Sequence, residues 1–297
     1  MDEITLKALA KINLGLDVVR RREDGYHEVR MVMQTLHLYD KLVLKKRTTP
    51  GIQIRTNLSF LPVNENNLVY RAGMLLMDEF GIKEGVSVQL EKRIPVAAGM
   101  AGGSTDAAAM LYGMNQMFGL RLSKKELMER GVKIGADVPY CIMRGTALAE
   151  GIGEKLKPVA PMIKCPVLIA KPAISVSTKF VYQNLKLDET TVHPDIDALL
   201  SDLEKQDFDA LCRDMGNILE TVTIPNYPII DKIKECMLAS GAAAAMMSGS
   251  GPTVFGLFRD EETARQARED MKKAGLARQV YLTSIYNNRC KRGGIHD

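Results

Sequence analysis

The stretch most informative about the fold lies at residues 86–119 and reads VSVQLEKRIPVAAGMAGGSTDAAAMLYGMNQMFG. Its first five residues alternate apolar and polar side chains, a period of two that predicts a strand. Glycines and alanines follow, and from about Ser104 the apolar residues recur with helical spacing. The sequence therefore predicts a strand, a glycine-rich loop and a helix in direct succession.

The glycine-rich loop in this stretch could hold an anion. Gly99, Gly102 and Gly103 precede Ser104, so backbone N–H groups can turn inward and the helix N-terminus can face a negative charge. The short alanine side chains leave room for a polyphosphate. The loop lacks the lysine of GxxxxGK[ST], and GxGxxG does not occur. On spacing alone, tight helix packing explains the loop as well as a phosphate cradle does.

The chain before this stretch is predicted to be mostly sheet. Strand-like runs at residues 12–19 and 29–38 flank a turn at 22–25, and residues 40–55 add further strand. Residues 66–80 predict an amphipathic helix behind an Asn-rich start.

A domain junction is predicted at PVAPMIKCP, residues 158–166, because three prolines there disfavour a helix or a central strand. The predicted domains are 1–160 and 161–297. The second is predicted to hold strands at 167–170, near 254–258 and at 280–284, and helices at 196–203, 208–219 and 261–274. Strands and helices mix without strict alternation, so the predicted fold class is α+β.

Composition and charge exclude several classes of protein. The chain has 297 residues, 46% hydrophobic and 26% charged, which is typical of a globular protein, and its length favours two domains. A net charge of +4 without a dense basic run disfavours nucleic-acid binding, and the short basic groups at 45–47 and 291–292 indicate solvated surface. No apolar run could span a bilayer and the start is acidic, so we expect no membrane partner and a cytoplasmic location.

Cysteines and histidines give no sign of a disulfide framework or a metal site. The odd number of scattered cysteines predicts reduced thiols, and no histidine pair has metal-ligand spacing. No metal ligands are therefore predicted, and any metal is expected to arrive with a nucleotide. The cysteines are Cys141, Cys165, Cys212, Cys236 and Cys290, and the histidines are His27, His37, His193 and His296.

Asp137 and Lys11 are candidates for catalysis. Asp137 stands in GADVP, where a carboxylate is desolvated unless partnered and could act as a base, although a cap or turn role is commoner. Lys11, within AKIN, would more often be a solvated strand residue. A buried Lys and Asp could nevertheless satisfy each other.

Two further segments could bind ligands. Asp24-Gly25-Tyr26-His27 offers a turn, an aromatic face and an imidazole that suit a planar base or a sugar, or it is a plain hairpin turn. SGSGPT, residues 248–253, could wrap an anionic or hydroxylated group with backbone amides, or it is a tight turn.

These segments occur together and in order: AKINLGLDVVRRREDGYHEV, NENNLVYRA, KRIPVAAGMAGGSTDAA, GADVPY and MSGSGPTVF. The set, from about Ala10 to Phe255, resembles the motifs of the GHMP small-molecule kinase superfamily. KINL combined with DGYH most closely resembles the branch that phosphorylates the 2-hydroxyl of 4-diphosphocytidyl-2-C-methyl-D-erythritol, in the non-mevalonate route to isoprenoid precursors.

The resemblance implies a ribosomal-protein-S5-like N-terminal domain, a ferredoxin-like C-terminal domain and an active site between them. It implies that Asp137 accepts the proton of the 2-hydroxyl and that Lys11 keeps that carboxylate ionised. ATP and Mg²⁺ are the implied cofactors, and the implied partner is a small molecule carrying a cytidine diphosphate group. The chain could be a monomer or a homodimer.

The resemblance also implies two sets of binding residues. The ATP set is Pro95, Val96, Ala97, Ala98, Gly99, Met100, Ala101, Gly102, Gly103, Ser104 and Thr105 around the triphosphate, with Asn67, Leu68 and Lys92 at the adenine. The acceptor set is Asn13, Tyr26, His27, Thr178 and Tyr182.

Two alternatives stay open at this point. A sister kinase acting on mevalonate, homoserine or a sugar would share the cradle but should lack DGYH beside KIN. A non-catalytic nucleotide-binding or RNA-binding protein built on the S5-like half would bind nucleotide without turnover.

Overall fold

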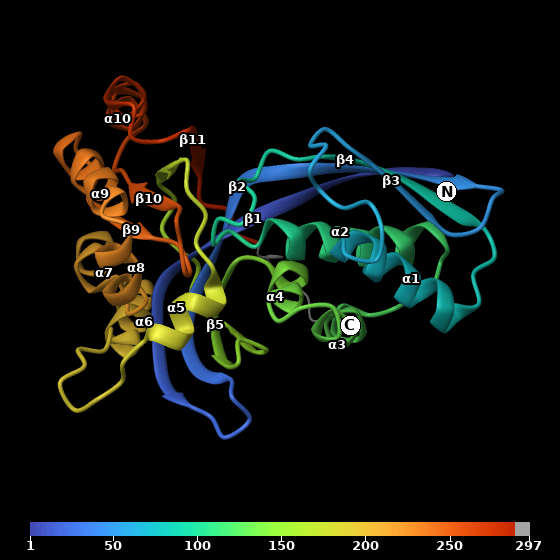
Figure 1. Cartoon of the computed structure of the whole chain (residues 1–297), viewed down its shortest axis with the longest axis horizontal. Coiled ribbons are helices and arrows are strands. Elements are labelled where there is room, and N and C mark those ends of the chain that lie inside the picture. The colour runs from blue at the N-terminus through green and yellow to red at the C-terminus, as the bar shows by residue number, and fades with distance from the viewer. Residues whose placement is uncertain (289–297) are drawn as a thin grey trace.

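The computed structural model describes residues 1–288, which form two sheets with helices packed on them (Figure 1). A long antiparallel hairpin dominates the first sheet: β1 (Glu3–Arg21) pairs with β2 (His27–Arg47) along most of its length. The turn between them, predicted at 22–25, is closed by the Arg22 N–H, which donates to the Tyr26 carbonyl at 2.8 Å. The register of this pair shifts between Leu9 and Lys11 and again between Asn13 and Gly15. Such irregularities re-aim side chains, and here they fall at two predicted site residues.

The first sheet is completed by short strands around the hairpin. Its order is β3–β4–β2–β1–β8, with β5 paired to β2 and β6 to β5. The added strands are β3 (Ile52–Thr56), β4 (Gly85–Glu91), β5 (Thr146–Gly151), β6 (Lys155–Pro158) and β8 (Gly216–Asn217). One face carries α1 (Leu68–Phe80), α2 (Gly102–Met117), α3 (Lys124–Val132) and α4 (Val138–Met143) (Figure 1).

The second sheet is antiparallel and has the order β11–β7–β10–β9. Its elements are β7 (Pro166–Lys171), α9 (Ile229–Ala239), β9 (Ala244–Met247), β10 (Val254–Leu257), α10 (Glu261–Ala274) and β11 (Gln279–Ser284). This β-α-β-β-α-β succession is the ferredoxin-like arrangement. The long β7–β9 connection holds α5 (Thr178–Asn184), α6 (Ile196–Lys205), α7 (Phe208–Asp214) and α8 (Glu220–Asn226).

The prediction of an α+β fold is confirmed, whereas the boundary at 160/161 stays a prediction. Two segments after that boundary return to the first sheet, because β8 pairs with β1 and Ile285 bridges Leu36. The predicted helix at 208–219 is too long. It ends at Asp214, since the next residues leave the helix to pair with β1.

The interior contains two clusters of apolar side chains. One lies chiefly between the first sheet and its helices, and it includes Leu42, Leu76 and Met110. The other joins the two sheets, where Ile12 and Leu14 of β1 pack with Ile169 and Phe255 of β7 and β10. This shared core fixes the sheets against each other.

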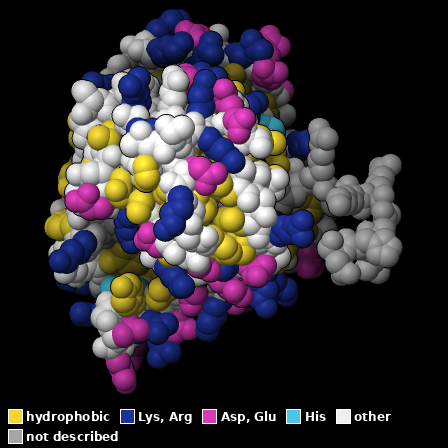
Figure 2. All heavy atoms as spheres, turned by 90° about the vertical axis from the view of Figure 1, so that its right-hand side faces the viewer, with side chains coloured by type: hydrophobic (Ala, Val, Ile, Leu, Met, Phe, Trp, Pro, Cys, Tyr) yellow, Lys and Arg dark blue, Asp and Glu magenta, His cyan; other side chains and the backbone are white. Residues whose placement is uncertain are grey.

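The surface and the thiols match an ordinary globular chain. Figure 2 shows Lys and Arg side chains interspersed with Asp and Glu on one face. No helix among residues 1–288 is long and apolar enough to cross a membrane. Cys141 and Cys165 are buried free thiols, whereas Cys212 and Cys236 are free but only half-buried. Cys290, His296 and the basic pair at 291–292 lie outside the described residues.

Candidate active site

A cleft of about 1500 Å³ opens where the two sheets meet. The β1–β2 hairpin, the loop before α2, the start of α4, α5 and residues 249–251 all contribute to its wall. Ligand pockets usually measure about 300–1000 Å³, so this cleft has room for two small molecules.

The loop before α2 presents backbone N–H groups to the cleft. Ala97, Gly99 and Ala101 have positive φ angles of 49°, 72° and 54°. Left-handed residues at alternate positions can turn successive N–H groups to the same side. Ala101 occupies the N-cap of α2 without a side-chain hydrogen bond, so the first N–H groups of that helix are free for an anion.

A second glycine-rich turn packs directly on this loop. Ser248 Oγ donates to the Gly99 carbonyl at 3.0 Å, and a Cβ on Gly99 would lie 2.0 Å from the Ser248 carbonyl oxygen. Asn217 fastens the turn by donating to the carbonyls of Met247 and Gly249, both at 2.8 Å. The two glycine motifs therefore meet backbone to backbone, and only glycine fits at position 99.

Lys11 and Asp137 lie together at the floor of the cleft. Lys11 Nζ is 3.9 Å from Asp137 Oδ2 and donates to Asn13 Oδ1 at 2.9 Å. Lys11 is buried, with 7% of its side chain exposed, but 34% of the Asp137 side chain is exposed. The expected burial of Asp137 is therefore wrong. Val138 and the following residues fill the core instead, and the Asp137 side chain makes no cap hydrogen bond, so its carboxylate stays free at the cleft.

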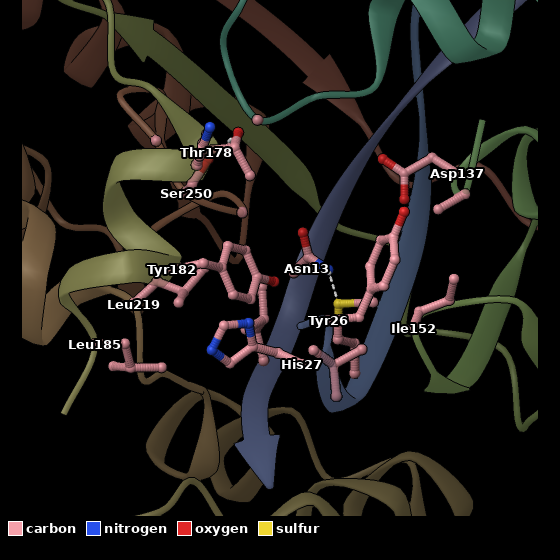
Figure 3. Close-up of a pocket in the computed structure, with 18 of the residues that line it drawn as sticks. Asn13, Tyr26, His27, Asp137, Ile152, Thr178, Tyr182, Leu185, Leu219 and Ser250 are labelled. Carbon is pink, nitrogen blue, oxygen red and sulfur yellow. Dashed lines mark hydrogen bonds between the residues drawn. The ribbon is translucent and has the colours of Figure 1, made fainter. Parts of the chain in front are cut away.

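Aromatic side chains line the other end of the cleft (Figure 3). The rings of His27 and Tyr182 are 5.1 Å apart and inclined by 47°, whereas Tyr26 is 62% exposed. In Figure 3 the Tyr26 ring stands across the opening from that pair, with its hydroxyl directed toward Asp137. Burial raises the pKa of Tyr182 to about 12. Burial, aided by the nearby charge of Arg21, lowers the pKa of His27, so its imidazole is neutral at physiological pH.

The structure brings most of the predicted site residues to the cleft. Those that line it are Lys11, Asn13, Tyr26, His27, Leu68, Ala97, Ala98, Gly99, Ala101, Gly102, Gly103, Ser104, Asp137, Thr178 and Tyr182. Thr178 Oγ1 lies 2.8 Å from Ser250 Oγ, so α5 is tied to the second glycine turn. Pro95, Val96, Met100 and Thr105 belong to the loop but are not part of the cleft wall.

Asn67 and Lys92 lie elsewhere. The Asn67 amide caps α1, accepting from the Val69 N–H at 2.9 Å, and it also donates to the Pro62 carbonyl at 2.8 Å. Lys92 is buried behind the loop between two carboxylates. Neither side chain is part of the cleft wall. Asn67 is engaged by the start of α1 and the loop before it, and Lys92 by one residue of β2 and one of α2.

Several cleft residues were not predicted. Leu185, Leu187, Ile152 and Leu219 give the aromatic end an apolar rim. His193 Nδ1 lies 2.7 Å from Asp17 Oδ1, across 176 positions of sequence. No local pattern marks such a pair, because its residues meet only through the tertiary fold.

No group of three or more His, Cys, Asp or Glu residues in the described part of the chain could hold a metal ion. Beside nucleotides, Mg²⁺ is commonly bound by substrate phosphates, water and one or two carboxylates.

Comparison with known proteins places this architecture among the GHMP kinases. The family model for the GHMP kinases N terminal domain matches residues 67–145, and that for GHMP kinases C terminal matches residues 199–277. A protein of Lachnoclostridium phytofermentans named 4-diphosphocytidyl-2-C-methyl-D-erythritol kinase is 55% identical over 97% of this chain and 99% of its own. A protein of the same name from Lachnospira eligens is 56% identical over 96% of this chain and 99% of its own.

Solved structures give the same picture. A crystal structure of 4-(cytidine 5'-diphospho)-2C-methyl-D-erythritol kinase superposes with a TM-score of 0.83 at 32% identity, covering 96% of this chain and 100% of the other. Homoserine kinase from Cytophaga hutchinsonii gives a TM-score of 0.75 at 22% identity, covering 96% of this chain and 95% of its own, and shares the fold alone.

Proposed function

Because the chain belongs to the 4-diphosphocytidyl-2-C-methyl-D-erythritol kinase family of the GHMP kinases, we propose that it transfers the γ-phosphoryl group of ATP to the 2-hydroxyl of that compound. The observation that carries the proposal is the meeting of three features in one cleft. These are an anion-binding loop, a free carboxylate beside a buried lysine, and an aromatic wall.

The loop at residues 97–104 would hold the triphosphate. Its uncapped helix N-terminus and turned N–H groups offer hydrogen-bond donors to the transferring oxygens. Phosphoryl transfer depends mostly on positioning and charge stabilisation, so this loop should supply most of the acceleration. Mg²⁺ bound with ATP would neutralise charge on the phosphates.

Asp137 would accept the proton of the acceptor hydroxyl as its oxygen attacks the γ-phosphorus. The bond from the γ-phosphorus to the β-phosphate oxygen breaks, and ADP leaves. Lys11, 3.9 Å from this carboxylate, would hold it ionised and help to position the hydroxyl. Asn13 fixes the ammonium through the 2.9 Å hydrogen bond. General-base assistance of this kind contributes typically about 10²- to 10⁴-fold.

The cytidine end of the acceptor would lie against the aromatic wall. Tyr26 and Tyr182 offer faces on which a pyrimidine can stack, and neutral His27 can donate one hydrogen bond and accept another. Thr178, held by Ser250, would lie beside the base or its ribose.

Product analysis tests this proposal. With Mg-ATP and 4-diphosphocytidyl-2-C-methyl-D-erythritol, ³¹P NMR should show a new phosphomonoester signal beside the diphosphate pair of the acceptor. A 2-deoxy analogue of the acceptor should give neither this signal nor ADP. Phosphorylation of the 2-deoxy analogue would place the transfer on another hydroxyl and contradict the proposal.

A further inference from the structure

A buried ionic cluster lies directly behind the phosphate loop. Lys92, Asp40 and Asp106 have side chains that are 4%, 0% and 3% exposed. Lys92 Nζ contacts Asp40 Oδ2 and donates to Asp106 Oδ2 at 2.6 Å. A Cβ on Gly102 would lie 3.2 Å from this ammonium, so the cluster touches the first residue of α2.

This cluster holds the loop at both ends. Asp40, near the middle of β2, accepts from the N–H groups of Arg93 at 2.5 Å and Ile94 at 2.8 Å, just before the loop begins. Asp106 belongs to α2, just after the loop ends. Lys92 joins the two carboxylates and so links both ends of the loop to the sheet.

The charges of the cluster do not balance if both carboxylates are ionised. Asp106 Oδ1 is buried and has no hydrogen-bond partner among the described residues. An ionised carboxylate with an unpartnered buried oxygen is costly, whereas a protonated one carries no charge to be solvated. Burial raises the pKa of Asp106 well above its usual range, with Asp40 adding to the rise and Lys92 opposing it.

We propose that Asp106 carries a proton in the working enzyme, and that the resulting neutral Lys92–Asp40–Asp106 cluster positions the loop for the triphosphate. The inference rests on the proposed function, because it takes this loop as the triphosphate site. Deprotonation would leave a net negative charge behind the loop and weaken ATP binding. The charged groups that face Asp106 are Lys92, which follows β4, and Asp40 on β2. Asp106 does not touch the nucleotide in this proposal; it is a positioning residue that acts through the loop.

Infrared difference spectroscopy of the unliganded protein tests the proton directly. Subtracting the spectrum of Asp106→Asn from that of the original protein at neutral pH should reveal the carbonyl band of a protonated carboxylic acid. A carboxylate band in its place would overturn the proposal. This measurement needs no nucleotide, so its outcome is independent of the proposed function.

The KM for Mg-ATP, followed from neutral to alkaline pH, tests the consequence. In the original protein it should rise about tenfold as Asp106 loses its proton. Asp106→Ala should raise it at every pH because the loop loses its anchor, and Asp106→Asn should restore a low KM without the alkaline rise. Any change in KM caused by the titration of ATP itself is common to both proteins. A rise in the KM of Asp106→Asn at alkaline pH equal to that of the original protein would therefore overturn the proposal.

Asp202→Asn is the matched control. Asp202 of α6 is buried as Asp106 is, with 6% of the residue exposed, also has a buried unpartnered oxygen, and lies outside the cleft. Its substitution should leave the alkaline rise in KM intact, and loss of the rise would mean that any buried aspartate has this effect. If neither the original protein nor any of these variants turned over ATP, the proposed function would fail. The infrared result would still decide whether Asp106 carries a proton.

Discussion

Asp137 is the residue on which the proposed chemistry depends most. Asp137→Asn should lower kcat by about 10²- to 10⁴-fold, because the amide cannot accept the proton of the hydroxyl. ATP binding, measured by calorimetry, should change by less than about twofold, since the proposed donors to the triphosphate are backbone N–H groups of the loop and not this side chain. Asp209→Asn, at an exposed ion pair with Arg259, is the control. Near-normal turnover in Asp137→Asn would remove this residue from the mechanism.

Tyr182 should determine affinity for the acceptor alone. Stacking of a base on an aromatic side chain is worth about 1–3 kcal/mol by alanine substitution, so Tyr182→Ala should raise the acceptor KM by about 5- to 150-fold. The KM for ATP should stay within about twofold. Tyr182→Phe keeps the ring and removes only the hydroxyl, so it should behave nearly as the original protein. A loss in the Phe variant equal to that in the Ala variant would mean that the hydroxyl, not the ring, binds the acceptor.

The sequence motifs predicted some contacts between single residues and missed others. Lys11 and Asp137 were paired correctly, and the structure adds that the lysine is the buried member. Lys92 was expected at the adenine, but it is buried in an ionic cluster with Asp40 and Asp106. These two partners are 52 and 14 positions away in the sequence. A buried ion pair leaves no local pattern, because its cost and its benefit both arise in the tertiary structure.

Among the elements, α2 begins with strained backbone. Ala101 at its N-cap has φ 54°, a conformation that costs a non-glycine residue about 1–2 kcal/mol. Ala101→Gly removes that cost, but the greater conformational entropy of glycine stabilises the unfolded state by about 0.4–1 kcal/mol. The free energy of unfolding should therefore stay level or rise slightly. Ala98 is 3% exposed and has no positive φ, so Ala98→Gly should be destabilising by about 1 kcal/mol. Equal losses in the two variants, measured by urea unfolding, would contradict this account.

Elements with strong local signals were predicted well. The helix predicted at 261–274 has those bounds, with Asp260 as its N-cap and a left-handed Gly275 at its end. Neither α3 nor α9 was predicted, and α4 is only six residues long. α4 nevertheless aims Asp137 into the cleft. So short an element is held by its contacts with α2 and α3, which periodicity cannot reveal.

The whole molecule depends on the close approach of two glycine loops. Gly99→Ala would push a Cβ against the Ser248 carbonyl, whereas Gly119, also at positive φ, has nothing within 4 Å of an added Cβ. Gly119→Ala should therefore cost only its backbone strain, about 1 kcal/mol. Gly99→Ala should cost about 1–3 kcal/mol more and also weaken ATP binding. Equal changes in Tm for the two variants would contradict a tight contact between the loops.

The arrangement of the whole molecule was predictable in kind but not in detail. Mixed strands and helices indicated α+β, and the resemblance to the GHMP kinases implied an active site between the two domains. The returns of β8 and Ile285 to the first sheet were not foreseeable, because pairings over such separations depend on the packed core. The same holds for the apolar rim formed by Leu185, Leu187, Ile152 and Leu219.

The acceptor identity is tested most directly by a coupled ADP-release assay with Mg-ATP. The acceptors compared would be 4-diphosphocytidyl-2-C-methyl-D-erythritol, mevalonate, homoserine and galactose. The cleft described here predicts ADP release with the cytidine compound alone, because only that acceptor fills both the Asp137 end and the aromatic end. Faster release with any other acceptor, or none with the cytidine compound, would contradict the account.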